Sequence, residues 1–407
     1  MDIIVQKYGG TSVANTRKIK SIAKNVSKLK KKNKSIVIVV SAMAGETDRL
    51  HNLTEKISKI PNEREYDEIV SSGEKVSAGL VAMALMDLKV KSISLAPAKF
   101  GLLTDDLHSK ATILSVGTKA IKDYLKKGYV VVVPGFQGVN LKGDTTTFGR
   151  GGSDLTAVAL ASGLKASHCE LLKDDVDGIY TTDPKLYKDA KKINYISYAE
   201  MLEMSSLGSK VLQAKAVEYA NNLKIKLYVK STSNNSKGGT WVMDEKSIPI
   251  KEQNAVTGIT HDLKQSKITI SGIQDKPGVA SRIFKPIGAA GIVVDMIVQN
   301  ISTDNKTDLT FTIPKVDLNK TLKILKTNRA KLNYDKLIEN KDIALISIVG
   351  AGMKTHTGVA TKMFDTLSKS RINISMISTS EIKISCVIDQ SKCKKAIKSL
   401  HKEFKLG

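Results

Sequence analysis

Over the first 240 residues, short runs of consecutive apolar residues alternate with longer segments of helical pattern. β-Branched runs occur at residues 3–6, 35–40, 91–95, 129–136 and 226–230. Unbroken apolar runs of this kind are typical of strands that are covered on both faces. Helix-length segments lie between them, for example at residues 16–32 and 65–88. This alternation predicts an α/β unit with a largely parallel sheet between helices, which we assign to residues 1–245.

The second part of the chain contains an internal repeat. Residues 277–299 align with residues 357–379 at a constant offset of 80 positions. The recurring residues are Gly278, Val279, Ala280, Phe284, Ile292, Met296 and Ile297, which return as Gly358, Val359, Ala360, Phe364, Ile372, Met376 and Ile377. Each copy has the pattern strand, glycine turn, helix, strand, and a further strand follows.

We therefore predict two small β-α-β-β modules, at residues 263–340 and 341–407, after a linker and first strand at 246–262. Neither module has a cluster of nucleophilic or acid–base side chains. We interpret both as binding or regulatory modules rather than as a second catalytic unit.

Composition excludes several classes of protein. The net charge of +24 comes almost entirely from scattered lysines, whereas nucleic-acid readers favour arginine and stacking aromatic residues. We therefore expect no nucleic-acid partner, although a basic field favours anionic substrates. No apolar run approaches the roughly 18 residues of a membrane helix, and the start has no basic segment of a signal peptide. The three cysteines form no C-x-x-C pair, so we expect a cytoplasmic protein without membrane contact.

The first candidate for chemistry is the sequence KYGGTS at residues 7–12, directly after an apolar run. Glycines allow the backbone to approach an anion closely, and free N–H groups at a helix start bind phosphate. Lys7 precedes the glycines, which is the reverse of the P-loop order. A β-turn with a solvated lysine remains the alternative to a phosphate site.

A long glycine-rich stretch at residues 134–161 ends in GRGGSD before an apolar helix. Arg150 is flanked by glycines, so its guanidinium is accessible to a carboxylate or phosphate. Ser153 and Asp154 lie where helix-capping residues are found, which is their structural alternative. An acid in such a loop would also orient a lysine or hold a magnesium ion.

Residues 171–187 predict a strand that runs into three aspartates, a glycine turn and the sequence TTDP. Acids beside an apolar and aromatic rim, Ile179 and Tyr180, suit a nucleoside pocket. A plain turn built from Asp-Gly and Asp-Pro is the alternative.

Together these motifs resemble one family. KYGGTS, SAMAG, PGFQGVN with TFGRGGSDLTA, DVDGIYTTDP and GSKVLQAKAVEYA occur in the order found in aspartokinases of the amino acid kinase superfamily. The two repeats resemble the paired ACT domains that regulate those enzymes. The resemblance implies an amino acid kinase fold, an αβα sandwich with a mainly parallel sheet, followed by two ferredoxin-like ACT domains. Nothing similar to a homoserine dehydrogenase follows, so we expect the monofunctional form.

The resemblance also implies the reaction. The β-carboxylate of L-aspartate would attack the γ-phosphate of ATP, with Mg²⁺ carried by ATP, and give 4-phospho-L-aspartate in the biosynthesis of lysine, threonine, methionine and diaminopimelate. A carboxylate is already ionised at neutral pH, so no general base is needed. A kinase of another amino acid or carboxylate, and a catalytically silent amino-acid sensor, are the competing hypotheses.

Residue roles follow from the same resemblance. The catalytic residues would be Lys7, Asp154 and Lys210. ATP would be bound by Lys7, Tyr8, Gly9, Gly10, Asp174, Asp175, Ile179, Tyr180, Asp183, Pro184 and Lys210. Aspartate would be bound by Ser41, Thr47, Glu74, Arg150, Gly152 and Ser153, with Glu74 facing the α-ammonium group.

Two features depart from the family's usual pattern. The sequence LLKDD before DVDG is one residue longer than the usual Thr-Asp form, so either Asp174 or Asp175 could contact the nucleotide. The sequence QAKA after GSKVL is similar to enzymes that lysine and threonine inhibit jointly, so we expect lysine or threonine, or both, as inhibitors.

Effectors would bind at the glycine turns of the two modules, and the modules would join subunits into a homo-oligomer. The expected effector residues are Asp275, Gly278, Val279, Ala280, Val294, Asp295, Gln299, Val359, Ala360, Asn373, Ile374 and Glu381. The alternative for the second module is a packing partner that binds no ligand.

Overall fold

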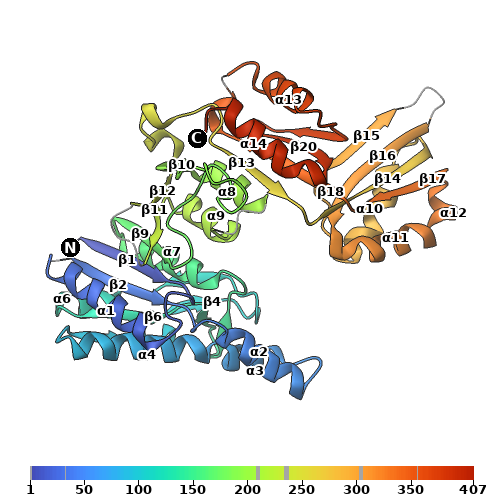
Figure 1. Cartoon of the computed structure of the whole chain (residues 1–407). Helices are drawn as coiled ribbons and strands as arrows, with labels where there is room; N and C mark the ends of the chain where they lie inside the picture. Colours follow the sequence, from blue (N-terminus) through green and yellow to red (C-terminus); the bar gives the residue numbers. More distant parts are fainter. Residues whose placement is uncertain (1, 33, 208–210, 233–237, 302–305, 355) are drawn as a thin grey trace. The chain divides into compact units, whose positions relative to one another are not determined.

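A computed structural model describes residues 2–32, 34–207, 211–232, 238–301, 306–354 and 356–407 (Figure 1). The chain forms two compact units. The first unit comprises Met1–Tyr180 and Lys192–Gln253, and the second comprises Thr181–Lys191 and Asn254–Gly407. A short segment from within the first half of the chain therefore belongs to the second unit.

An eight-stranded sheet forms the centre of the first unit, in the order β10-β12-β11-β9-β1-β2-β6-β3. Its strands are β1 Ile3–Tyr8, β2 Ser35–Val40, β3 Ser92–Ser94, β6 Val130–Pro134, β9 His168–Lys173, β10 Tyr195–Ser197, β11 Leu227–Ser231 and β12 Thr240–Met243. The strands from β11 to β3 in this order are all parallel, and β12 is antiparallel to β11. The predicted parallel sheet and its five predicted strands are confirmed.

Helices cover both faces of this sheet. On one face, α1 (Thr16–Lys30) and α4 (Ser72–Asp87) lie side by side and share an apolar core with β1, β2 and β6 (Figure 1). Alternate residues of β1 point to the other face, where α7 (Gly152–Leu164) packs on β1 and β9. The other helices of this unit are α2 Glu46–Ile57, α3 Glu63–Val70, α5 Pro97–Phe100, α6 Lys119–Lys126, α8 Tyr198–Ser206 and α9 Ala214–Asn222.

Two features of this unit differ from the sequence prediction. The helix expected at 65–88 is divided at Ser71 into α3 and α4. A second sheet, in the order β5-β4-β7-β8, was not predicted, because strands of three or four residues are too short to show a periodic pattern. Its strands are β4 Leu102–Thr104, β5 Ile113–Val116, β7 Gln137–Val139 and β8 Thr145–Thr147.

Among the described residues, the stretch Glu63–Asp87 alone has the length and apolar composition of a membrane helix. Half of its most apolar window is buried inside the protein, as in the core helix of a globular domain. This stretch is therefore weak evidence for a membrane span.

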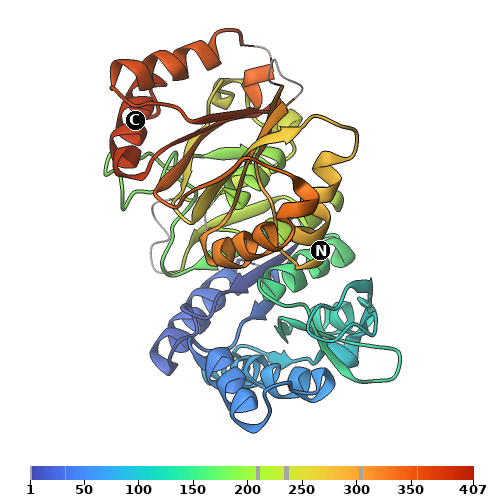
Figure 2. The same ribbon diagram turned by 90° about the vertical axis from the view of Figure 1, so that its right-hand side faces the viewer.

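The second unit contains two four-stranded antiparallel sheets (Figure 2). The first module has the order β15-β16-β14-β17, and its elements are β14 Gln265–Gln274, α10 Val279–Ala289, β15 Ile297–Ile301, β16 Lys306–Pro314, α11 Leu318–Thr327, α12 Arg329–Leu332 and β17 Lys336–Asn340. The second module has the order β13-β18-β20-β19, and its elements are β13 Gly258–Asp262, β18 Ile343–Val349, α13 Val359–Lys369, β19 Met376–Thr379, β20 Lys383–Asp389 and α14 Cys393–Glu403. Because β13 precedes the first module in sequence, the first module is an insertion in the second.

The internal repeat is visible in the backbone. Gly278 and Gly358 both precede a helix with positive φ, of +89° and +81°. Few residues other than glycine adopt this conformation, which explains why the glycine recurs. Met296 and Met376 are equally buried in their respective modules.

The segment Thr181–Lys191, which we call the strap, completes the second module. Its two ends are joined by a hydrogen bond from the Thr181 N–H to the Lys191 carbonyl (2.9 Å). The Thr181 hydroxyl lies 2.8 Å from Nε2 of the buried His401. The rings of Tyr187 and His401 lie 4.6 Å apart and are tilted by 56°, and Leu186 packs on the same core. The second module therefore includes side chains from the middle of the first unit's sequence.

Candidate active site

The carboxyl ends of β1, β2, β6 and β9 meet at one edge of the large sheet. Gly9, after β1, donates a hydrogen bond to the Leu172 carbonyl of β9 (3.3 Å). On the other side, Ser41 donates to the carbonyl of Tyr8 (3.1 Å). In the sheet, β2 lies on one side of β1 and β9 lies on the other, so the order of the strands reverses at β1. In open α/β sheets, ligands bind at such a switch point.

Two glycines allow the loops at this edge to approach one another. A Cβ atom on Gly10 would lie 3.0 Å from the carbonyl oxygen of Ala42. A Cβ atom on Gly135 would lie 2.8 Å from Cβ of Ser153. Glycine is therefore required at position 135, where the loop after β6 meets the start of α7, and a side chain at position 10 would force the loop after β2 to shift.

A buried ion pair occupies the centre of the site. Nζ of Lys7 lies 2.5 Å from Oδ1 of Asp154, and the two side chains are only 9% and 4% exposed. Although burial alone would raise the pKa of Asp154, the charges of Lys7 and Lys173 outweigh it and hold that pKa below its ordinary value. Asp154 is therefore an ionised carboxylate that fixes Lys7 beside the glycine turn.

Lys173, the last residue of β9, is a third member of this cluster that sequence reasoning missed. Its ammonium lies 4.0 Å from Oδ2 of Asp154. Residues 169, 171 and 173 share one face of β9, the face that carries α7. In the sequence, only the alternation of side chains along the strand indicated this placement, because lysines are abundant throughout the chain.

Glu74, in the first turn of α4, is the second buried acid near these loops. It is 3% exposed, and one carboxylate oxygen accepts a hydrogen bond from the backbone N–H of Ala42 (3.0 Å). The other oxygen is buried without a partner among the described residues. Burial raises the pKa of Glu74 to about 7, against the opposing effect of backbone N–H groups and Lys7. An unpaired buried carboxylate of this kind is suited to bind a ligand cation.

The other residues expected to bind aspartate lie on the same loops. Ser41 follows β2 directly, and Thr47 is in the first turn of α2. Gly152 and Ser153 begin α7, and both are buried. Arg150 is exposed just before this helix, and in the described part of the chain no carboxylate lies within ion-pair distance of its guanidinium.

The residues expected at the phosphates and ribose of a nucleotide differ in how far the protein already engages their side chains. Tyr8 turns its side chain into the core, where its hydroxyl donates to Gln6 (3.1 Å), so only its backbone is available to a ligand. Asp174 is already engaged by Nζ of Lys18 (2.5 Å) and the hydroxyl of Thr232 (2.8 Å). Asp175 is exposed. The structure therefore leaves Asp175 more available to a nucleotide than Asp174.

Farther along, Ile179 is buried and the Tyr180 hydroxyl donates to Asp177 (2.8 Å). Asp183 and Pro184 lie in the strap, where Asp183 accepts a hydrogen bond from the Lys185 N–H (2.9 Å). Lys210 falls outside the described residues.

In the first module, the expected effector residues surround the turn before α10. The side chain of Val279 is buried in the module's core, and those of Ala280 and Val294 pack against it and are partly buried. Asp275, Asp295 and Gln299 are exposed, and Gly278 begins α10. This turn presents helix N–H groups together with three exposed polar side chains.

The second module repeats this arrangement in part. Val359, Ala360 and Ile374 face the core, whereas Asn373 is exposed. Glu381 is also exposed and forms an ion pair with Lys354 (3.2 Å).

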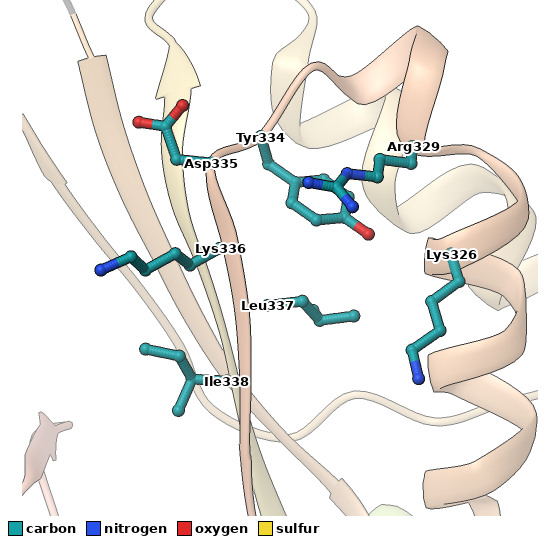
Figure 3. Close-up of a pocket in the computed structure, with 7 residues that line it drawn as sticks. All are labelled: Lys326, Arg329, Tyr334, Asp335, Lys336, Leu337 and Ile338. Carbon is teal, nitrogen blue, oxygen red and sulfur yellow. The ribbon is translucent and has the colours of Figure 1, made fainter.

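A hollow of about 560 Å³ lies elsewhere in the first module (Figure 3). It lies between α11, α12 and β17, and the guanidinium of Arg329 lies over the ring of Tyr334, 5.5 Å from its centre. None of the expected catalytic or effector residues lines it. Its cations, Lys326, Arg329 and Lys336, are exposed surface side chains.

The model of the amino acid kinase family matches residues 2–231, and that of the ACT domain matches residues 268–328 and 346–404. The chain is 47% identical over 406 residues to an aspartate kinase, Ask_LysC, of Stutzerimonas stutzeri. It is 46% identical to an aspartokinase of Pseudomonas aeruginosa. Each alignment covers 100% of this chain and 98% of the relative.

Solved structures give the same result. A crystal structure of E. coli aspartokinase III in complex with aspartate and ADP (R-state) has a TM-score of 0.76 and 26% identity, and covers 99% of both chains. The T-state complex of that enzyme with lysine and aspartate has a TM-score of 0.81 and 25% identity. It covers 99% of this chain and 100% of the other.

Proposed function

This chain belongs to the amino acid kinase family and, within it, to the aspartokinases with ACT regulatory domains, and we propose how its residues carry the aspartate kinase reaction. The observation that supports the assignment of roles is the buried pair of Lys7 and Asp154 beside the unpaired carboxylate of Glu74. A cation for phosphoryl oxygens and an anion for an ammonium group thus lie at one edge of the sheet.

Lys7 and the glycine turn form the phosphoryl end of the proposed site. The Lys7 ammonium, fixed by Asp154, would bond to oxygens of the γ-phosphoryl group, and the backbone N–H groups of Gly9 and Gly10 would bind the neighbouring phosphates. Stabilisation of the developing charge by such fixed donors accelerates phosphoryl transfer. No proton has to move, because the attacking carboxylate is already ionised.

Glu74 and Arg150 form the aspartate end. The free oxygen of Glu74 would accept from the α-ammonium group, and Arg150 would clamp a carboxylate with Ser153 beside it. Ser41 and Thr47 would supply hydroxyl contacts. Recognition of an ammonium and a carboxylate in fixed positions selects an α-amino acid and aligns its β-carboxylate with the phosphate.

The nucleotide is proposed to be ATP, with Asp175 and Tyr180 at its base and ribose and with Lys210 as a further phosphate ligand. In the described part of the chain, no three metal-binding side chains gather, and Asp154 is engaged by two lysines. We therefore propose that Mg²⁺ enters as the ATP complex, as is usual for this cation. When bound, it would neutralise phosphate charge.

Regulation is proposed to operate through the two ACT modules. Lysine, threonine or both would bind at the glycine turn before α10, and in the second module near Asn373, and would favour an inactive arrangement of the subunits. We further propose that the ACT modules join subunits into a homo-oligomer. The reaction would begin lysine, threonine, methionine and diaminopimelate biosynthesis in the cytoplasm.

Steady-state kinetics would test this proposal. ADP release should be measured by a coupled assay with aspartate, glutamate and carbamate as acceptors, and then with lysine and threonine added separately and together. We expect turnover with aspartate and inhibition by at least one end product. Turnover with glutamate or carbamate but not with aspartate would refute the assignment.

A further inference from the structure

Lys173 lies at the position in the sheet where phosphate chemistry is expected. It ends β9, directly after Leu172, whose carbonyl accepts the hydrogen bond from Gly9 of the glycine turn. The strand β9 is the neighbour of β1 in the sheet, at the switch point where ligands bind in such sheets. Lys7 and Lys173 therefore lie near the same carboxyl edge of the sheet, on adjacent parallel strands and on the same face.

Lys173 has no hydrogen-bonded anion among the described residues. Asp154 is the only carboxylate within ion-pair distance of both lysines among the described residues, and Lys7 already approaches it to 2.5 Å. At 4.0 Å, Lys173 is too far from Asp154 for a hydrogen bond, and in the described part of the chain its ammonium makes none. The buried ammonium group of Lys7 and the partly buried one of Lys173 thus share one carboxylate within ion-pair distance, and within the described ranges that of Lys173 has no hydrogen-bonded anion.

A structural role does not account for this arrangement. Asp154 is neutralised by Lys7 alone, and a second cation only 18% exposed adds desolvation and repulsion. Consistent with this, burial and the repulsion from Lys7 lower the pKa of Lys173, against the attraction of Asp154 and Asp175. The charge of such a side chain is stabilised when an anion binds at this edge of the sheet.

We propose that Lys173 is a second phosphoryl-binding lysine, whose ammonium donates hydrogen bonds to the γ-phosphoryl oxygens as they pass from ATP to the acceptor. This inference rests on the kinase reaction. In that step a bond forms between a β-carboxylate oxygen of aspartate and the γ-phosphorus, and the bond from that phosphorus to the bridging oxygen of ADP breaks. Lys173 remains protonated throughout, and the carboxylate of Asp154 offsets the repulsion between the two ammonium groups.

The test compares Lys173→Met with Lys230→Met. Lys230, on the neighbouring strand β11, is a matched control because it is 21% exposed and pairs with the buried Glu170 at 2.8 Å. We expect Lys173→Met to lower kcat by about 10²–10³-fold, the usual effect of removing one donor to a developing charge, with KM for aspartate nearly unchanged. Lys230→Met should keep kcat within about threefold of that of the unmodified protein. Lys173→Arg should recover part of the loss, whereas Lys173→Gln should not.

A binding measurement tests the role of Lys173 independently of which acceptor the protein phosphorylates. Calorimetric titration with ADP, Mg²⁺ and aluminium fluoride, which mimics the transferring phosphoryl group, does not require turnover or aspartate. Lys173→Met should weaken this complex at least tenfold and leave binding of ADP with Mg²⁺ unchanged. Equal affinities for the mimic in variant and unmodified protein, or a kcat loss no larger than that of Lys230→Met, would overturn the proposal.

Discussion

Replacing Glu74 by glutamine tests how the site recognises the amino group of its substrate. The glutamine keeps an oxygen that can accept the hydrogen bond from the Ala42 N–H, so the start of α4 should stay in place. It removes the negative charge that the unpaired oxygen offers to a ligand. Loss of one member of a buried, hydrogen-bonded charge pair costs about 3 kcal/mol. That corresponds to about a 150-fold rise in KM for aspartate.

The pH dependence sharpens this test. Burial raises the pKa of Glu74 to about 7 in the free protein, and a bound ammonium group requires the ionised carboxylate. As pH falls from 8 to 6, most of the free protein becomes protonated at Glu74, so KM for aspartate should rise about tenfold. Neither the β-carboxylate nor the α-ammonium group of aspartate titrates in this range.

The assay is a coupled measurement of ADP release at several aspartate concentrations between pH 6 and 8.5. Glu74→Gln should have a high KM that does not vary with pH. Glu68→Gln, on the preceding helix, is the control, because Glu68 is a partly exposed acid that pairs with Lys75. If Glu74→Gln retains the low KM, or if its KM keeps the pH dependence of the unmodified protein, Glu74 does not bind the ammonium group.

Three further predictions concern the phosphate site, the effector sites and the strap. Lys7→Ala should lower kcat by at least about 10³-fold and leave lysine binding measurable by calorimetry, and retained turnover would remove Lys7 from the mechanism. Asp275→Ala should raise the lysine or threonine concentration for half-inhibition about tenfold with the uninhibited kcat unchanged. Glu381→Ala should have a smaller effect, because Glu381 is already paired with Lys354. Unaltered inhibition in both variants would place the effector elsewhere. His401→Ala removes the contacts with the strap, and should lower the melting temperature of the second unit by about 4–8 °C, or about 2 kcal/mol, in calorimetry. An unchanged melting temperature would show that the strap is not held there.

The sequence was sufficient to predict the large sheet and the loops at its edge. Unbroken apolar runs such as residues 35–40 exist because helices cover both faces of β2, and that burial leaves a clear pattern. Parallel strands end at a common edge, so the neighbourhood of Lys7 and the loop before Asp154 followed from strand direction alone. The ion pair between them agrees with that reasoning.

Other features depend on tertiary contacts that leave no local pattern. The engagement of Asp174 by Lys18 joins residues that are far apart in sequence, and adjacent aspartates look equivalent until the fold separates them. The side chain of Tyr8 points into the core because of its parity in β1, although the preceding lysine points to the site. Lys173 was missed because one lysine in a lysine-rich chain carries no signal.

The strap also limits how such a chain can recombine with its relatives. A single crossover in the gene near codon 254 would deliver a complete pair of regulatory modules without the eleven residues that cover His401. The incoming His401 would then pack against the strap of the recipient protein, whose sequence did not evolve together with it. A functional exchange of the regulatory modules between such genes therefore needs two additional crossovers, one on each side of codons 181–191, or later substitutions in the strap.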